Sequence, residues 1–174
     1  MTNPAPRKVI VTDANVLINF LNVGRLDLLT ELPGFAFVIP DNVDAEILRE
    51  DQRQVLARCY DEGTLQRQAL IDIEAIGVFA DLSLVMGKGE AACIALARQM
   101  GWLVGSDEKG VVRRKAVELV GPGRLVTTPG IMVLAIKAGV LDVDEADRLK
   151  GALAKRRFMM NFDSFRDVLE REAP

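Results

Sequence analysis

The sequence predicts an α/β fold in which a central, mostly parallel sheet is covered by helices on both faces. Short runs of β-branched and other apolar residues alternate along the chain with longer stretches of helical periodicity. Strands connected through helices pair in parallel, and strands with uninterrupted apolar sequences are buried on both faces. Together these two observations predict a three-layer α/β/α sandwich.

The strand pattern begins near the N-terminus and recurs along the chain. The run KVIVT is β-branched and is followed at once by an acidic residue, Asp13. FAFVIP, WLVGSD and RLVTT are similar apolar runs, and LQRQALIDI has the weaker pattern of an edge strand. Strands are therefore expected at residues 8–12, 35–40, 65–73, 102–107 and 124–128.

Helical periodicity fills the intervals between these strands. One helix is expected over residues 14–29, and another begins where Asp41 can act as an N-cap and continues past Ile47. The segment GEAACIALARQM is small and apolar on almost all sides, as expected for a helix packed against a sheet, and Gly101 can end it. The remaining inner helices are expected at residues 52–63 and 108–119.

Helical signals also dominate the C-terminal part of the sequence. Thr128 followed by Pro129 predicts a helix start, and Gly139 can end that helix. Residues 142–145 spell a capping box for a further helix, and Asp163 can begin a last one.

The composition is that of a globular protein, with 49% hydrophobic and 27% charged residues among 174. We expect a single domain over residues 1–174, with residues 140–174 as its helical C-terminal extension. No apolar run approaches the ~20 residues of a membrane-spanning helix. The start MTNPAPRK has no apolar signal core, so a cytoplasmic protein without membrane association is expected. Cys59 and Cys93 are expected to be free thiols.

Charge and residue usage limit the chemistry. The chain has 22 basic and 25 acidic residues and a net charge of −3, so no global positive field attracts nucleic acid. Aromatic residues make up only 5%, which argues against stacking platforms for single strands. The chain contains no histidine, which excludes histidine triads, histidine-ligated zinc and an imidazole general base.

Four acidic residues stand where the chain passes from strand to helix or begins a helix: Asp13, Glu46, Glu90 and Asp107. Each by itself is explained as a helix cap or dipole partner worth ~0.5 to 2 kcal/mol. The carboxyl ends of parallel strands share one edge, where α/β sheets bind ligands. Carboxylates gathered there repel each other unless a divalent cation lies between them. Their combination therefore favours a shared Mg²⁺ or Mn²⁺ site.

The spacing of the residues does not decide every member of this site. Asp44 and Glu46 both flank the apolar stripe of their expected helix, so periodicity does not choose between them. Asp107 can simply cap the helix that follows it, with Ser106 or Glu108 as local competitors.

Four segments, in order, resemble the pattern of the PIN-domain nuclease family: VIVTDANVLINFLNVGRLDLL, VIPDNVDAEIL, GKGEAACIALA and WLVGSDEKGVVRRKAVEL. TTPGIMVLAIKAGVL and FMMNFDSFRDVL are similar to the C-terminal part of a prokaryotic, toxin-type branch. The resemblance implies a PIN-like, Rossmann-like sandwich. It also implies that the acids matching Asp13, Glu46, Glu90 and Asp107 are catalytic and metal-binding, which selects Glu46 over Asp44.

The same resemblance implies a metal-dependent ribonuclease, the toxin of a toxin–antitoxin pair, with RNA as substrate and a small antitoxin protein and a second copy of the chain as partners. Asn15, Ser106 and Thr128 are candidate supporting residues. Many relatives carry a further acid beside the last aspartate. Here Ser106 precedes Asp107, and Glu108 is the nearby substitute.

Basic residues near the expected site are candidate RNA contacts. Lys109, Arg113 and Arg114 follow Asp107 on the next expected helix, whose ordinary alternative is a solvated surface. A second basic cluster at residues 155–157 is expected to be a solvated helix end. The apolar residues that follow it, Phe158, Met159, Met160 and Phe162, are expected in the core or in a dimer contact rather than in a groove for another partner.

Two other functions fit parts of the pattern. A protein with the same fold could serve as a binding module with a silent site. A haloacid-dehalogenase-type phosphatase also begins with an aspartate at the end of its first strand, but it needs a second aspartate where this chain has Asn15.

Overall fold

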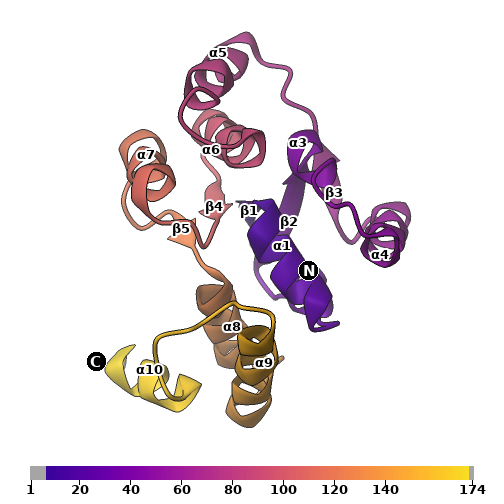
Figure 1. The fold of residues 1–174 in the computed structure, drawn as a ribbon, viewed down its shortest axis with the longest axis vertical. Coiled ribbons are helices and arrows are strands. Elements are labelled where there is room, and N and C mark those ends of the chain that lie inside the picture. Colours follow the sequence, from indigo (N-terminus) through magenta and orange to yellow (C-terminus); the bar gives the residue numbers. More distant parts are fainter. Residues whose placement is uncertain (1–6, 173–174) are drawn as a thin grey trace, which may run out of the picture.

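In the computed structural model, residues 7–172 are described, and this part of the chain contains one five-stranded, all-parallel sheet (Figure 1). The strand order is β3-β2-β1-β4-β5. The strands are β1 (Lys8–Thr12), β2 (Phe35–Pro40), β3 (Gln66–Gln68), β4 (Leu103–Gly105) and β5 (Leu125–Val126). The expected strands all exist, although the later three are shorter than their apolar runs.

The first strand is the centre of the sheet. Val11 pairs with Val38 of β2 on one side and with Val104 of β4 on the other, and its side chain is fully buried. Thr12, the last residue of β1, pairs with Gly105, the last residue of β4. The residues that follow these two strands therefore leave the sheet side by side at its carboxyl edge.

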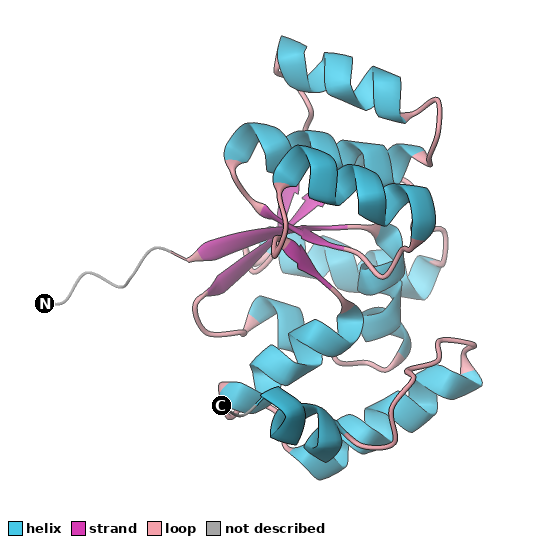
Figure 2. Ribbon diagram, turned by 90° about the vertical axis from the view of Figure 1, so that its left-hand side faces the viewer, coloured by secondary structure: helices cyan, strands magenta, loops and turns pink. Residues whose placement is uncertain are grey.

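Helices cover both faces of the sheet, as Figure 2 shows. Packed on one face is α6, which contacts β1, β2 and β4 and lies between α5 and α7. The opposite face carries α1 and α2, with α2 against α8, α8 against α9 and α9 against α10. This arrangement confirms the predicted three-layer sandwich. The bounds are α1 (Ala14–Asn22), α2 (Asp27–Thr30), α3 (Asp41–Asp44), α4 (Glu50–Asp61), α5 (Ile73–Leu82), α6 (Lys88–Met100), α7 (Gly110–Val120), α8 (Thr128–Lys137), α9 (Val143–Lys155) and α10 (Phe165–Glu172).

Two clusters of buried apolar side chains hold these layers together. The larger includes both faces of β1 and reaches the C-terminal helices, where Met160 is 8% exposed and Phe165 is fully buried. The smaller joins α5, α6 and α7 through Leu82, Ile94 and Ala116. No helix formed within residues 7–172 has the length and apolar character needed to cross a membrane. Cys59 and Cys93 are free thiols, as expected.

The first predicted helix is interrupted. Instead of running over residues 14–29, the chain leaves α1 after Asn22 and begins α2 at Asp27. Gly24 adopts a φ of +65°, a conformation that costs other residues energy and that reverses the chain between the two helices. The apolar periodicity continues across this break, which is why it suggested a single helix.

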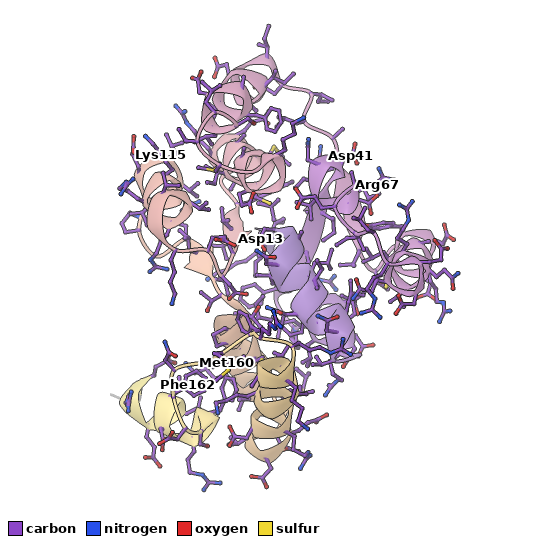
Figure 3. The ribbon with its side chains drawn as sticks, viewed as in Figure 1. Asp13, Asp41, Arg67, Lys115, Met160 and Phe162 are labelled. Carbon is purple, nitrogen blue, oxygen red and sulfur yellow. The ribbon has the colours of Figure 1, made fainter. Side chains whose placement is uncertain are left out.

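The helix expected after Asp41 is also shorter than predicted. It consists of four residues, ends at Asp44, and has no side-chain cap at its start. The Asp41 carboxylate instead accepts hydrogen bonds from Nε and Nη2 of Arg67, at 3.2 and 3.1 Å (Figure 3). A guanidinium from the neighbouring edge strand has therefore replaced the backbone amide as partner. As a result Glu46 lies in a turn beyond α3, not on a helix.

The starts of the three C-terminal helices agree with the sequence predictions to different degrees. Thr127, not Thr128, caps α8 by accepting from the backbone of Gly130, and Thr128 is the first helical residue. Asp142 caps α9 as predicted, accepting from Glu145. The last helix begins two residues after Asp163.

That last helix obtains its cap from another helix. Asp147 of α9 accepts a hydrogen bond from the backbone of Phe165 at 2.9 Å and one from the Ser164 hydroxyl at 2.7 Å. The Ser164 hydroxyl in turn accepts from the backbone of Arg166. Ser164 rather than Asp163 therefore caps α10, and the support that it receives from Asp147, 17 residues earlier on α9, leaves no local signal.

Candidate metal centre at the carboxyl edge of the sheet

Asp13 is the most buried acidic residue of the candidate site, with an exposed fraction of 1%. It follows β1 directly, and its backbone amide donates to the carbonyl of Gly105 at 2.9 Å. Oδ1 accepts from the backbone of Val16 at 2.9 Å and so caps α1. Oδ2 is buried without a hydrogen-bond partner among the described residues. One oxygen thus serves the helix, while the other is left for a ligand.

The environment of Asp13 favours its protonated form. Burial raises its pKa from 3.8 to about 7, against the lowering effect of the Ser106 hydroxyl and of the Val16 amide. Nearby Asp107 and Glu90 add to the rise by charge repulsion. The Ser106 hydroxyl is close enough to Asp13 to matter electrostatically, but it does not form a hydrogen bond of normal geometry with Oδ2. A bound cation would reverse the balance by stabilising the carboxylate.

Glu46 and Glu90 meet at the first turn of α6. Oε1 of Glu46 accepts a hydrogen bond from the backbone of Gly89 at 3.0 Å. A Cβ at Gly89 would stand 2.5 Å from that oxygen, and a Cβ at Gly87 would clash with Oε2 of Glu90. The pKa of Glu46 is raised by partial burial and then by the charge of Glu90. Two glycines therefore make the room in which these two carboxylates lie.

Asp107 follows β4 and is held by the start of α8. Oδ1 accepts from the backbone of Thr128 at 2.7 Å, and Oδ2 accepts from the Thr128 hydroxyl at 2.5 Å and from Nδ2 of Asn19 at 3.2 Å. Burial raises the pKa of Asp107, and these hydrogen bonds oppose the rise. The alternative role of Asp107, a cap for α7, is not what the structure has, because the N-cap position of α7 is Lys109, without a side-chain hydrogen bond. Its donors come instead from the neighbouring helices.

The other predicted supporting residues occupy the same edge. Asn15 donates to Oε1 of Glu108 at 2.7 Å, and the Ser106 hydroxyl accepts from the backbone of Glu108 at 3.2 Å. One carboxylate oxygen of Glu108 is therefore engaged with Asn15. Asn15 fills the position that a phosphatase of the dehalogenase type would require to be an aspartate.

The four acids interact in pairs. The negative charges of Asp107 and Glu90 raise the pKa of Asp13, and the charge of Glu90 raises the pKa of Glu46. Figure 3 shows Asp13 near the middle of the molecule, where the two layers of helices meet the sheet. Within residues 7–172, no three histidine, cysteine, aspartate or glutamate side chains are arranged as a ready-made metal site. The donor set itself, carboxylate oxygens with one buried oxygen unpartnered, fits a hard divalent cation.

Sequence reasoning missed two contributors to this edge. Asn19 is 7% exposed and joins Asp107 to Thr128 by donating to both side chains. A polar residue in the otherwise apolar stretch VLINFL is the signal that could have identified it. Gly89 was counted only as part of a small, apolar helix, although it donates the hydrogen bond that fixes Glu46.

The predicted basic residues lie on the surface beside Asp107. Lys109 precedes α7, and Arg113 and Arg114 lie in its first two turns, all with exposed side chains. Lys115 is different, because it forms an ion pair with Glu118 at 2.9 Å. Three cations thus stand near the acidic edge.

Comparison of the sequence with known protein families assigns the chain to one of them. The model of the DUF3368 family, described as a PIN domain, matches residues 9–172. Among solved structures, the crystal structure of PAE2754 from Pyrobaculum aerophilum is similar, with a TM-score of 0.43 and 14% identity over 75% of this chain and 98% of that chain. No sequence match was found among curated proteins. Since the family model spans nearly all of the sequence, the chain belongs to the PIN-domain family.

Proposed function

We propose that this protein is a metal-dependent ribonuclease whose acidic residues are Asp13, Glu46, Glu90 and Asp107. The observation that carries the proposal is Oδ2 of Asp13, a buried and unpartnered carboxylate oxygen at the ligand-binding edge of a PIN-domain sheet. A buried carboxylate needs a counter-charge or a proton. A divalent cation is the counter-charge that neighbouring carboxylates can share.

Asp13, Glu90 and Asp107 would hold a Mg²⁺ or Mn²⁺ ion, directly or through water. Such an ion, when bound, makes a water ligand more acidic and offsets the charge of the phosphate under attack. The hydrogen bonds from Thr128 and Asn19 keep the Asp107 carboxylate in one orientation, as partners of metal ligands do.

Proton transfer falls to carboxylates, because the chain has no histidine. Glu46 is the most exposed of the four acids and has a raised pKa, so it would complete the shell of the ion or orient the attacking water. Lys109, Arg113 and Arg114 would bind phosphates of the RNA on either side of the cleaved bond. With a net charge of −3, RNA binding depends on such local clusters.

Cleavage of a fluorogenic single-stranded RNA in Mg²⁺ or Mn²⁺ tests the activity. Asp13→Asn keeps the oxygen that caps α1 and should remove most of the cleavage. Asp61→Asn is the matched control, because Asp61 is an exposed residue at the end of α4. Full activity in Asp13→Asn, or full activity after thorough chelation, contradicts the proposal.

The biological role that we propose is that of a toxin neutralised by a small antitoxin protein, acting as a homodimer in the cytoplasm. The support is the likeness to the toxin-type branch of the family. Expression of the wild-type protein should slow growth, and Asp13→Asn should not. Light scattering of the purified protein measures the oligomeric state. An active enzyme that is harmless on expression and purifies without a short inhibitory partner contradicts this role.

A second candidate is a PIN-fold binding module without catalysis. It is favoured by the hydrogen bonds on Asp107, whose two oxygens both already have donors within the chain. Calorimetric titration with Mn²⁺ distinguishes the two functions. A nuclease binds the ion through Asp13 and cleaves RNA, whereas a binding module retains RNA affinity in Asp13→Asn and cleaves nothing in either form.

A further inference from the structure

An open pocket of about 410 Å³ is lined in part by Glu46. Its walls come from α1, from the turn that carries Glu46, from the start of α4 and from the end of α9. The volume lies in the range of small-molecule sites, about 300 to 1,000 Å³. We call it the Arg156 pocket, after the C-cap residue of α9 that lines it.

The polar floor of the Arg156 pocket is fixed by hydrogen bonds. Gln52 is 5% exposed and donates to Oδ1 of Asn22 at 3.1 Å, and Nη1 of Arg49 donates to the same oxygen at 3.3 Å. Arg49 also pairs with Asp51, through Nη2 at 2.5 Å. Its guanidinium is therefore held in place before any ligand arrives, which lowers the entropy lost on binding.

Arg156 supplies a charge that the protein does not use internally. Within residues 7–172, no carboxylate lies within ion-pair distance of its guanidinium. Arg156 ends α9, and the next residue, Arg157, has a φ of +67°. It is the one residue other than glycine with a positive φ in the described part of the chain. A turn that favours glycine instead carries a second arginine, next to Arg156 in the sequence.

The apolar wall is formed by Leu48 and Ile18. Leu48 is 82% exposed although it is a large aliphatic side chain, and it lines the same pocket as Arg49 and Arg156. A ligand that fits this wall has a flat apolar part and a negative charge close together. An unpaired nucleotide has both, in its base and its phosphate.

We propose that the Arg156 pocket binds one unpaired nucleotide of single-stranded RNA next to the cleaved phosphodiester bond. Arg49 and Arg156 bind its phosphate, and its base lies against Leu48 and Ile18. The choice of RNA rests on the proposed function, which places the cleaved bond near Glu46. An unpaired base can lie against this wall, whereas a paired base stacks within its helix and does not reach it.

Fluorescence anisotropy with a short labelled single-stranded oligoribonucleotide tests this pocket. The full-length protein carries Asp13→Asn in all samples, so that cleavage does not consume the probe. Arg156→Ala should raise Kd about tenfold, as expected for loss of a charge-assisted phosphate contact. It should also reduce the slope of log K against log salt concentration by about 0.7, the value for one phosphate on a single strand.

Matched variants separate the pocket from general charge and hydrophobicity. Arg148→Ala removes an exposed arginine from the same helix and should change neither Kd nor the salt slope. Leu48→Ala should raise Kd about threefold without changing the slope, whereas Leu84→Ala, at a similarly exposed leucine, should have no effect.

Three results would overturn the proposal. They are equal effects of Arg156→Ala and Arg148→Ala, equally tight binding of a duplex of the same sequence, and displacement of the RNA by polyglutamate as readily as by unlabelled RNA. The last would identify the surface as one for acidic protein segments. Cleavage by the wild-type enzyme is measured separately. Loss of cleavage with binding that still depends on Arg156 rejects the nuclease function alone, and normal cleavage with binding that is independent of Arg156 rejects the pocket alone.

Discussion

Asp107 and Thr128 are joined by two hydrogen bonds, one from the backbone amide at 2.7 Å and one from the hydroxyl at 2.5 Å. Asp107 follows β4, and Thr128 is the first residue of α8, so the pair connects the acidic edge of the sheet to the C-terminal helices. Thr128 is fully buried. The carboxylate therefore serves in the candidate site and also fixes the position of α8.

Removing the Thr128 hydroxyl should destabilise the protein. Thr128→Val keeps the shape and the backbone bond but removes the hydrogen bond to Oδ2 of Asp107. We expect a loss of about 1 to 3 kcal/mol in the free energy of unfolding, measured in urea. Thr128→Ser keeps the hydroxyl and should lose less, and Thr30→Val is a control on another helix. An unchanged unfolding free energy in Thr128→Val would show that the bond contributes nothing net.

This pair also shows where sequence reasoning ends. The position of Asp107 after a strand was predictable from local periodicity, because an apolar run that stops at an acid marks the end of a strand. Its partner was not, since the apparent partner was the helix that follows at once. The actual donor is 21 residues further along the chain, at the start of α8.

Other features of the fold likewise divide into those that local sequence patterns predict and those that depend on long-range contacts. The alternation of strands with helices was predictable for β1, β2, β4 and β5, and so was the capping role of Asp13 at α1. The helix α5 was not predicted, because its first residue, Ile73, falls within the expected edge strand. The partner of Asp41 was not predictable, because this carboxylate forms an ion pair with Arg67 of the edge strand β3, whose weak pattern gave no sign of the contact. The hydrogen bond from the Gly89 amide to Glu46 depends on the turn after α3, and it could not be predicted from the sequence either.

Asp13 should make the stability of the metal-free protein depend on pH. Its pKa is 3.8 in the unperturbed state and about 7 in the fold, so the folded chain binds the proton more tightly than the unfolded chain. This contribution to stability is present below pH 3.8 and is lost as the pH rises through about 7, a change of about 4 kcal/mol in total.

The asparagine side chain of Asp13→Asn does not titrate, so this variant should not lose stability as the pH rises. Urea unfolding should therefore show the variant to be more stable than the wild type at about pH 8, with a difference that shrinks toward about pH 4. Asp61→Asn should follow the wild type throughout. Adding Mn²⁺ at about pH 8 should raise the stability of the wild type only. A gap between variant and wild type that does not vary with pH would mean that Asp13 is not buried as a titrating group.

Gly89→Ala should weaken metal binding without weakening the fold. The new Cβ would lie 2.5 Å from Oε1 of Glu46, and this partly exposed side chain can move away at low cost. Alanine also favours the helix by up to about 1 kcal/mol over glycine. We expect unchanged or slightly higher stability together with lower Mn²⁺ affinity in calorimetry. Gly77→Ala has open space for its Cβ on α5 and should change only stability. Equal Mn²⁺ affinity in both variants would remove Glu46 from the metal centre.

Arg157→Gly should stabilise the end of α9. The backbone of Arg157 donates to the carbonyl of Ala154 and that of Phe158 donates to Leu153, each at 3.0 Å, which is the Schellman pattern. Arg157 occupies the left-handed position of this motif with a φ of +67°, where glycine has no steric penalty.

We expect Arg157→Gly to raise the free energy of unfolding by about 0.5 to 1 kcal/mol. Arg148→Gly, in the middle of the same helix, should lower it by a similar amount because glycine disfavours helix. Thermal unfolding of the two variants gives shifts of opposite sign if φ at residue 157 is the cause. If both variants lose stability, the Arg157 side chain makes a stabilising contribution that outweighs the backbone strain. Arginine at this position then stabilises the fold, and no ligand is needed to explain why it is there.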